Sequence, residues 1–189
     1  MQVQHKHRFW AGLAVGGAMV ALVLPATAAL GQTAVRHDPA HDVIRTRFST
    51  DGSDVAAPHN KIADIVHVRY AHTIRRVVTT MRIRHYGGRW EYWEDIKTPT
   101  RKYLVTGEGH ETRQSFDLET ESGRVLPCDG LSAKVDRADN TFRVSVPATC
   151  LEQPPWVRTH LQYDVLARNG DELIDLNPRS PFTPRLYTT

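Results

Sequence analysis

Four potential metal ligands lie close together near the start of the chain, within the six residues 37–42. Imidazole and carboxylate groups at this density are ligands that Zn²⁺ or Cu²⁺ accept. A specific metal site also needs ligands that the fold holds in place, and this segment contains Pro39 and little that could pack. We therefore predict no specific metal site, and the candidates for weak binding are His37, Asp38, His41 and Asp42.

The densest aromatic group of the chain is Trp90, Tyr92 and Trp93, with acidic residues on both sides. On a β-strand Trp90 and Tyr92 share one face, while Trp93 points to the other. An exposed ring beside carboxylates is suited to stack on a sugar or a peptide, whereas core aromatics with a polar rim produce the same pattern. We take the three aromatic residues as candidate ligand-binding residues, with core packing as the alternative.

Further acidic residues and histidines are scattered along the chain. Four aspartates suit a Ca²⁺-binding loop by type, but they lack the twelve-residue EF-hand spacing: Asp51, Asp54, Asp64 and Asp95. Three histidines would form a pH-sensitive surface if adjacent strands brought them together: His67, His85 and His160.

Motifs for catalysis are mostly missing from the sequence. It contains no Gly-x-Ser-x-Gly segment and no glycine-rich phosphate loop, and the run from His110 to Gln114 lacks the second histidine of a His-Glu-x-x-His zinc helix. Glu119 and Glu121 would serve a glycosidase only at the right separation. We predict no catalytic residue and no cofactor, and whether the protein is an enzyme stays open.

The first 28 residues have the features of a secretory signal peptide. Lys6 and Arg8 precede an uncharged, mostly apolar run over residues 10–24, Pro25 follows, and Ala26–Ala28 places small residues at positions −3 and −1 of a cleavage site. The apolar run is shorter than the ~20 residues of a membrane span. We expect cleavage after Ala28, export by the general route and no stable membrane insertion afterwards.

The two cysteines of the chain, Cys128 and Cys150, flank a predicted β-hairpin. Apolar residues alternate with polar ones over 131–136 and again over 142–146, on either side of a polar turn. The matching register pairs Val135 with Phe142 and brings the cysteines to the same end of the hairpin. In an oxidising compartment this predicts a structural disulfide, and a reactive or metal-binding thiol is the less favoured alternative.

The remaining pattern is that of short strands. Alternation recurs over residues 64–70, 77–84 and 157–165, and further candidate strands lie at 90–93, 102–106 and 114–118. We predict an all-β fold, a single antiparallel β-sandwich of jelly-roll-like or immunoglobulin-like type with one disulfide. The expected layout is a signal peptide (1–28), a flexible arm (29–42) and the sandwich domain (43–189).

The small net charge of the chain argues against the large basic surface of a nucleic-acid-binding protein. The 24 Lys and Arg residues against 21 Asp and Glu give a formal charge of +3, which falls to +1 when Lys6 and Arg8 leave with the signal peptide. A nucleic-acid-binding protein would carry a much stronger positive footprint. Nucleic acid is therefore not an expected partner.

Two segments carry a resemblance to known proteins: Pro-Cys-Asp-Gly-Leu at 127–131 and Val-Ser-Val-Pro-Ala-Thr-Cys-Leu at 144–151. With the strand order before them, they resemble a group of small secreted β-sandwich proteins of high-GC Gram-positive bacteria to which no function is assigned. The strand pattern is also similar, at the level of the fold, to DOMON-type and carbohydrate-binding sandwich modules. The resemblance supports the fold and the disulfide, and it implies no active-site residue.

These observations lead to one functional hypothesis and two alternatives. The chain is expected to be an exported, non-catalytic β-sandwich that binds an extracellular or cell-envelope ligand, either carbohydrate or protein. The alternatives are a small secreted hydrolase acting on carbohydrate or peptide, and a structural or inhibitory protein acting through protein contacts.

Overall fold

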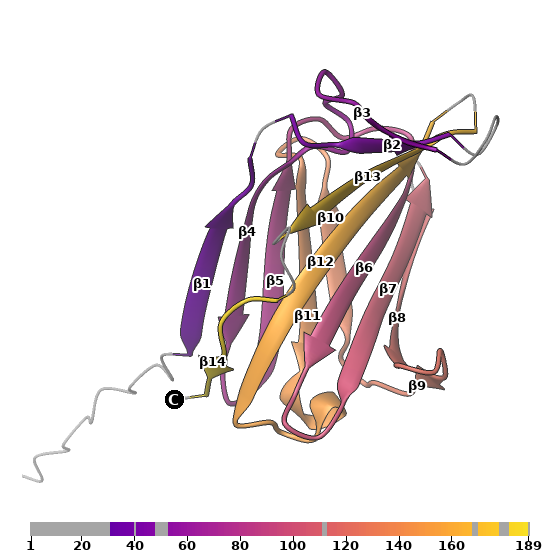
Figure 1. Ribbon diagram of the computed structural model, residues 1–189. Helices are drawn as coiled ribbons and strands as arrows, with labels where there is room; N and C mark the ends of the chain where they lie inside the picture. The colour runs from indigo at the N-terminus through magenta and orange to yellow at the C-terminus, as the bar shows by residue number, and fades with distance from the viewer. Residues whose placement is uncertain are drawn as a thin grey trace, which may run out of the picture.

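The chain folds into two antiparallel β-sheets that face one another across a shared core (Figure 1). The computed structural model describes residues 31–39, 41–47, 53–110, 113–167, 170–177 and 182–188, so the predicted signal peptide lies outside the described residues. The predicted all-β sandwich with one disulfide is confirmed. In the described ranges, no helix has the length and apolar character needed to cross a membrane.

The smaller sheet has five strands in the order β1 (Gln32–His37), β4 (Ile65–His72), β5 (Arg76–Ile83), β11 (Thr141–Pro147) and β10 (Ser132–Asp136). The larger sheet has the order β3 (Asp54–Ala56), β2 (Ile44–Thr46), β13 (Glu172–Asn177), β12 (Trp156–Leu166), β6 (Arg89–Lys97), β7 (Lys102–His110), β8 (Arg113–Thr120) and β9 (Val125–Leu126). Strand β14 (Leu186–Tyr187) also pairs with β12, and a single 3₁₀ turn, η1 (Ala148–Leu151), follows β11.

Strand β5 shows how alternation creates these sheets. Val77, Thr79, Met81 and Ile83 are buried against the opposite sheet, as the period-two pattern predicts. Its intervening residues lie on the outer face of the five-stranded sheet, where they are half-buried or exposed. The predicted face assignment of this strand is confirmed.

Strand β4 departs from simple alternation. The sequence pattern predicts Val66 on the face of Val68 and Tyr70, with Ile65 on the other face. In the structure the pairing with β5 shifts between Ile65 and His67, and Ile65, Val68 and Tyr70 are all fully buried. A β-bulge inserts one residue and reverses the alternation that precedes it, so Ile65 joins the core and the prediction for the start of this strand is wrong.

The segment predicted as a flexible arm contains a strand. Residues 32–37 form β1, whose six residues pair in an unbroken antiparallel ladder with β4 at the edge of the five-stranded sheet. Of the half-buried positions in β1, only Ala34 is apolar. Backbone pairing rather than side-chain burial holds this strand, and for that reason the hydrophobic pattern does not reveal it.

Aromatic rings fill the centre of the sandwich. Trp90 meets Phe142 edge-on with ring centroids 5.0 Å apart, and Phe142 also contacts Tyr163 at 5.2 Å. The indole N–H of Trp90 donates to the hydroxyl of Tyr86 at 2.8 Å. Gly109 on β7 leaves the space for this indole, because a Cβ at that position would lie only 2.2 Å from a carbon of the Trp90 ring.

The disulfide closes the predicted hairpin. Strands β10 and β11 pair Val135 with Phe142 and Ala133 with Val144, in the expected register. Cys128 and Cys150 are bonded with a Cα–Cα distance of 5.5 Å, and both cysteines pack against the core. The bond ties β10, at the edge of its sheet, to the end of β11.

Removing this bond is expected to destabilise the fold by roughly 3 kcal/mol, since the cross-link lowers the entropy of the unfolded chain. A Cys128→Ser/Cys150→Ser double variant should therefore unfold at lower urea concentration than the oxidised protein. The reduced wild-type protein is the matched control and should unfold with the variant. An unchanged urea midpoint would show that the bond does not restrain the unfolded chain.

A carboxyl group lies between the two sheets. The Glu94 side chain is 1% exposed and accepts hydrogen bonds from the hydroxyls of Thr79 and Tyr92. Burial raises the pKa of Glu94 to about 7, although the two donated hydrogen bonds oppose the shift. The folded protein therefore holds a proton on Glu94 that the unfolded chain releases at lower pH.

We expect Glu94 to make the fold less stable as pH rises. Its contribution is fully present below the unfolded pKa of about 4.5 and is lost as pH approaches 7, which corresponds to roughly 3 kcal/mol. Glu94→Gln, which keeps the shape without the charge, should weaken this pH dependence in urea unfolding measured at pH 5 and pH 7.5. Glu121→Gln, at the surface, is the control and should keep the wild-type slope. Equal slopes in wild type and Glu94→Gln would contradict the assignment.

Candidate functional site

Strand β6 presents a different set of residues to each side of the larger sheet. Trp90 and Tyr92 point inward and are 1% and 0% exposed, so core packing holds for these two and they are not available to a ligand. Trp93 points outward and is 37% exposed, between Glu91 and Asp95 on the same face. Of the three aromatic candidates, only Trp93 lies at a surface.

Neighbouring strands place polar side chains directly beside this outward row. On one side, β12 sets Asp164 opposite Glu91, Gln162 opposite Trp93 and His160 opposite Asp95. On the other side, β7 sets Glu108 opposite Glu91, Thr106 opposite Trp93 and Leu104 opposite Asp95. Paired residues of an antiparallel sheet point to the same face, so the Trp93 ring stands within a polar surface that spans the middle of the sheet.

Two open hollows lie on this surface, and Trp93 and Glu91 line both. The hollow toward β12 and β13 has a volume of about 480 Å³ and is also lined by Asp95, Leu104, His160, Gln162, Asp164 and Glu172. The hollow toward β7 and β8 has a volume of about 360 Å³ and is also lined by Thr106, Gly107, Glu108, Ser115, Asp117 and Glu119. We call the two hollows together with the ring the Trp93 surface.

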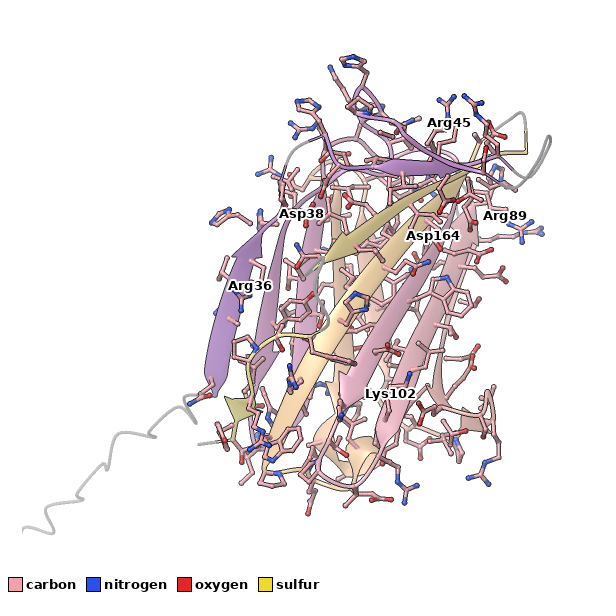
Figure 2. The ribbon with its side chains drawn as sticks, viewed as in Figure 1. Arg36, Asp38, Arg45, Arg89, Lys102 and Asp164 are labelled. Atoms are coloured by element: carbon pink, nitrogen blue, oxygen red, sulfur yellow. A yellow bond between two sulfur atoms is a disulfide. The ribbon has the colours of Figure 1, made fainter. Side chains whose placement is uncertain are left out.

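The Trp93 surface is acidic. Seven of its lining residues are carboxylates, and the basic groups beside it are engaged at the ends of the sheet. Lys102 lies 3.6 Å from Asp95 and 3.4 Å from Glu121, and Arg89 lies 3.5 Å from Glu108. Figure 2 shows Lys102 and Arg89 toward opposite ends of β6, with Asp164 over β12.

Three of these carboxylates converge. Glu91, Asp164 and Glu172 each place one oxygen within 4.8 Å of the others, and we call them the outer carboxylate cluster. Asp164 is 3% exposed and receives one hydrogen bond, from the Gln162 amide at 2.8 Å. Burial, with the charges of Glu172 and Glu91, raises the pKa of Asp164 to about 7. Burial and the charge of Glu91 also raise the pKa of Glu172.

A second carboxylate group lies at the edge of the sandwich beside β1. Asp38 and Asp42 meet Asp175 from β13, each offering an oxygen within 4.8 Å of the others. Asn177 donates its amide to Asp38 at 2.6 Å, and the backbone N–H of Ile65 donates to Asp175 at 2.8 Å. Burial is the main cause that raises the pKa of Asp38 to about 7 and that of Asp175 to about 8.

The four metal-ligand candidates of the segment 37–42 therefore lie in different places. Asp38 and Asp42 join Asp175, whereas the histidines point elsewhere. His37 is exposed, with its ring 6.2 Å from that of His67, and His41 is exposed with Nδ1 2.6 Å from the Pro58 carbonyl oxygen. The four residues that local spacing suggested as metal ligands therefore do not surround one point.

The other candidates of the sequence do not cluster either. Asp54 accepts a hydrogen bond from Thr46, Asp64 pairs with Arg84 and Asp95 pairs with Lys102, while Asp51 lies outside the described residues. His67 belongs to the five-stranded sheet and His160 to the nine-stranded sheet, where it packs against Phe182. Glu119 accepts from Thr106, and Glu121 lies near Lys102.

A larger hollow, of about 770 Å³, lies at the turn between β7 and β8. Its lining combines both signs of charge and, among the described residues, contains no Trp, Tyr or Phe: Arg89, Glu108, Gly109, His110, Arg113, Gln114 and Ser115. Because it borders residues 111 and 112, which the structure does not describe, we base no function on it.

Sequence reasoning missed Asp164, Gln162 and Glu172 as site residues. The alternation of β12 predicts that Gln162 and Asp164 share one face, but nothing local indicates that this strand pairs with β6. Glu172 lies on β13, one strand further from β6, with Leu166 of β12 as its partner. Only the strand order brings the three strands together.

The chain matches no protein-family model, and no curated protein and no solved structure is significantly similar to it. The resemblance to secreted β-sandwich proteins of high-GC Gram-positive bacteria therefore stays a prediction.

Proposed function

We propose that the protein is an exported carbohydrate-binding β-sandwich that holds a saccharide chain across the Trp93 surface. The observation that carries this proposal is the exposed indole of Trp93 between two polar hollows. An aromatic face provides apolar contact area of fixed geometry. The surrounding oxygen and amide groups provide hydrogen-bond partners for hydroxyls.

The size and charge of the surface favour a particular class of saccharide. The hollows lie on both sides of one ring, so a ligand of several sugar units would contact both, with the central unit on the indole. The seven carboxylates accept hydrogen bonds from hydroxyl or amino groups and repel negative charge. A neutral or amino-substituted oligosaccharide is the ligand class that fits.

Two observations support export. The first 28 residues have the pattern of a cleavable signal peptide. The mature part of the chain forms a disulfide between its two cysteines, a bond typical of oxidising compartments.

Binding is favoured over hydrolysis by the burial of Asp164. A glycosidase needs an acid with raised pKa that reaches the scissile bond. Two acids of this surface have a raised pKa: Asp164 is 3% exposed and offers a substrate almost no accessible surface, and Glu172 is half-buried beside it. The alternative ligand is a protein, which would also contact the exposed ring of Trp93. That alternative would apply if this chain bound no saccharide and if Trp93 were essential for its contact with a protein partner.

Trp93→Ala removes the stacking face, so we expect it to weaken saccharide binding at least tenfold. A tenfold loss corresponds to roughly 1.4 kcal/mol of binding free energy. Isothermal titration with neutral and amino-substituted oligosaccharides measures the change. Trp93→Phe, which keeps an aromatic face, should retain part of the affinity.

Tyr187→Ala is the matched control, because Tyr187 is also exposed, at 43%, and lies on the same sheet beside Trp156. It should bind as the wild type does. Wild-type protein that binds no member of the panel, or Trp93→Ala that binds unchanged, would rule out the proposed site.

Charge provides a separate prediction. In buffer containing EDTA, anionic polysaccharides rich in uronic acids should bind at least tenfold more weakly than neutral chains of the same length, owing to repulsion from the acidic surface. The difference should shrink as salt is added, and titrations at low and high NaCl measure it. Equal or tighter binding of the anionic chains would contradict the electrostatic argument.

A further inference from the structure

The outer carboxylate cluster combines residues from three adjacent strands. Glu91 on β6 and Asp164 on β12 are direct partners across the sheet, and Glu172 on β13 lies opposite Leu166, two residues along β12 from Asp164. All three side chains line the hollow of about 480 Å³. The register of the sheet thus places three acidic groups around one point.

Asp164 is the most buried member of the cluster. It is 97% buried, its Oδ2 accepts the Gln162 amide, and its Oδ1 is buried without a hydrogen-bond partner. A buried carboxylate oxygen that receives no donor is costly. This second observation is independent of the proximity of the acids: the Oδ1 of Asp164 is an acceptor that a bound cation would satisfy.

The described part of the chain supplies no cation to the cluster. Within the described ranges, no Lys, Arg or His lies within 4.0 Å of any of its three carboxylates. The nearby basic groups on neighbouring strands, Arg89 and Lys102, pair with other acids. Like charges directly opposite on adjacent strands are destabilising, so a bound cation would relieve the repulsion between Glu91 and Asp164.

We propose that Glu91, Asp164 and Glu172 bind a Ca²⁺ ion, which joins β6, β12 and β13 on the outer face of the sheet. Ca²⁺ takes oxygen ligands at 2.3–2.6 Å, so two ligands on opposite sides of one ion lie about 4.6–5.2 Å apart. One oxygen from each of the three carboxylates lies within 4.8 Å of the other two, so these three oxygens fit around a single ion. The hollow leaves room for the water or hydroxyl oxygens that complete six to eight ligands.

The donor set favours Ca²⁺ over other metals. It holds carboxylates only, whereas Zn²⁺ and Cu²⁺ prefer sets with imidazole or thiolate. Mg²⁺ requires near-ideal octahedral geometry at 2.0–2.1 Å and retains its own waters. The proposed ion lies beside Trp93, but its binding does not require a saccharide. The experiment therefore uses Ca²⁺ alone as the probe.

The test is thermal unfolding of the oxidised protein in EDTA and in increasing CaCl₂, with calorimetric titration of CaCl₂ into chelator-treated protein. We expect a saturable rise in Tm, with half-saturation at about 0.1–1 mM, as extracellular calcium modules show. MgCl₂ at the same concentrations should give a much smaller rise. Absence of a saturable Ca²⁺ response in the wild type overturns the proposal.

Three variants locate the ion. Glu172→Gln should weaken Ca²⁺ binding at least tenfold, and in EDTA it should melt no lower than wild type, because it removes repulsion without removing a known partner. Asp38→Asn addresses the second carboxylate group and should keep the Ca²⁺ response, as should Trp93→Ala. If Asp38→Asn abolishes the response while Glu172→Gln keeps it, the ion binds at the edge of the sandwich and the proposal is wrong.

Discussion

Strands β6 and β12 pair over nine residues in the middle of the larger sheet, and their register decides what meets on both faces. On the inner face it brings Tyr92 opposite Tyr163 within the aromatic core. On the outer face it sets Asp164 beside Glu91 and Gln162 beside Trp93. A slip of one residue would turn the aromatic face to solvent and the carboxylates to the core, so packing of the core fixes the geometry of the proposed site.

The protein compensates its buried acids to different degrees. Glu94 accepts from two hydroxyls, and Asp175 accepts from two backbone N–H groups, those of Ile65 and Leu176. Asp164 accepts from one amide only. The first two sets of bonds lie within the sandwich and link its sheets or strands, whereas the third leaves the Oδ1 of Asp164 without a hydrogen-bond partner. Glu94 and Asp175 therefore have hydrogen-bond partners at both carboxylate oxygens, whereas Asp164 has one at a single oxygen.

Local pattern predicted much of this fold. Alternation in β5 and β12, the hairpin of β10 and β11, the disulfide and the opposite orientations of Trp90 and Trp93 all follow from residues close in sequence. The bulge at Val66 and the edge strand β1 do not, because the first changes the period within a strand and the second pairs through its backbone. The outer carboxylate cluster was not predicted, since Glu91 and Glu172 meet only through the order of the strands.

That order has a consequence for how the molecule forms. Strand β12 lies between β6 and β13, and β13 in turn carries β2 from near the start of the chain. Until residues 156–177 have been synthesised, β6 and β2 are open edges with unpaired N–H and C=O groups. A C-terminal truncation before β12 therefore removes the middle of a sheet and not its margin. Nearly the whole polypeptide must be available before the larger sheet closes, so folding of this domain follows its synthesis.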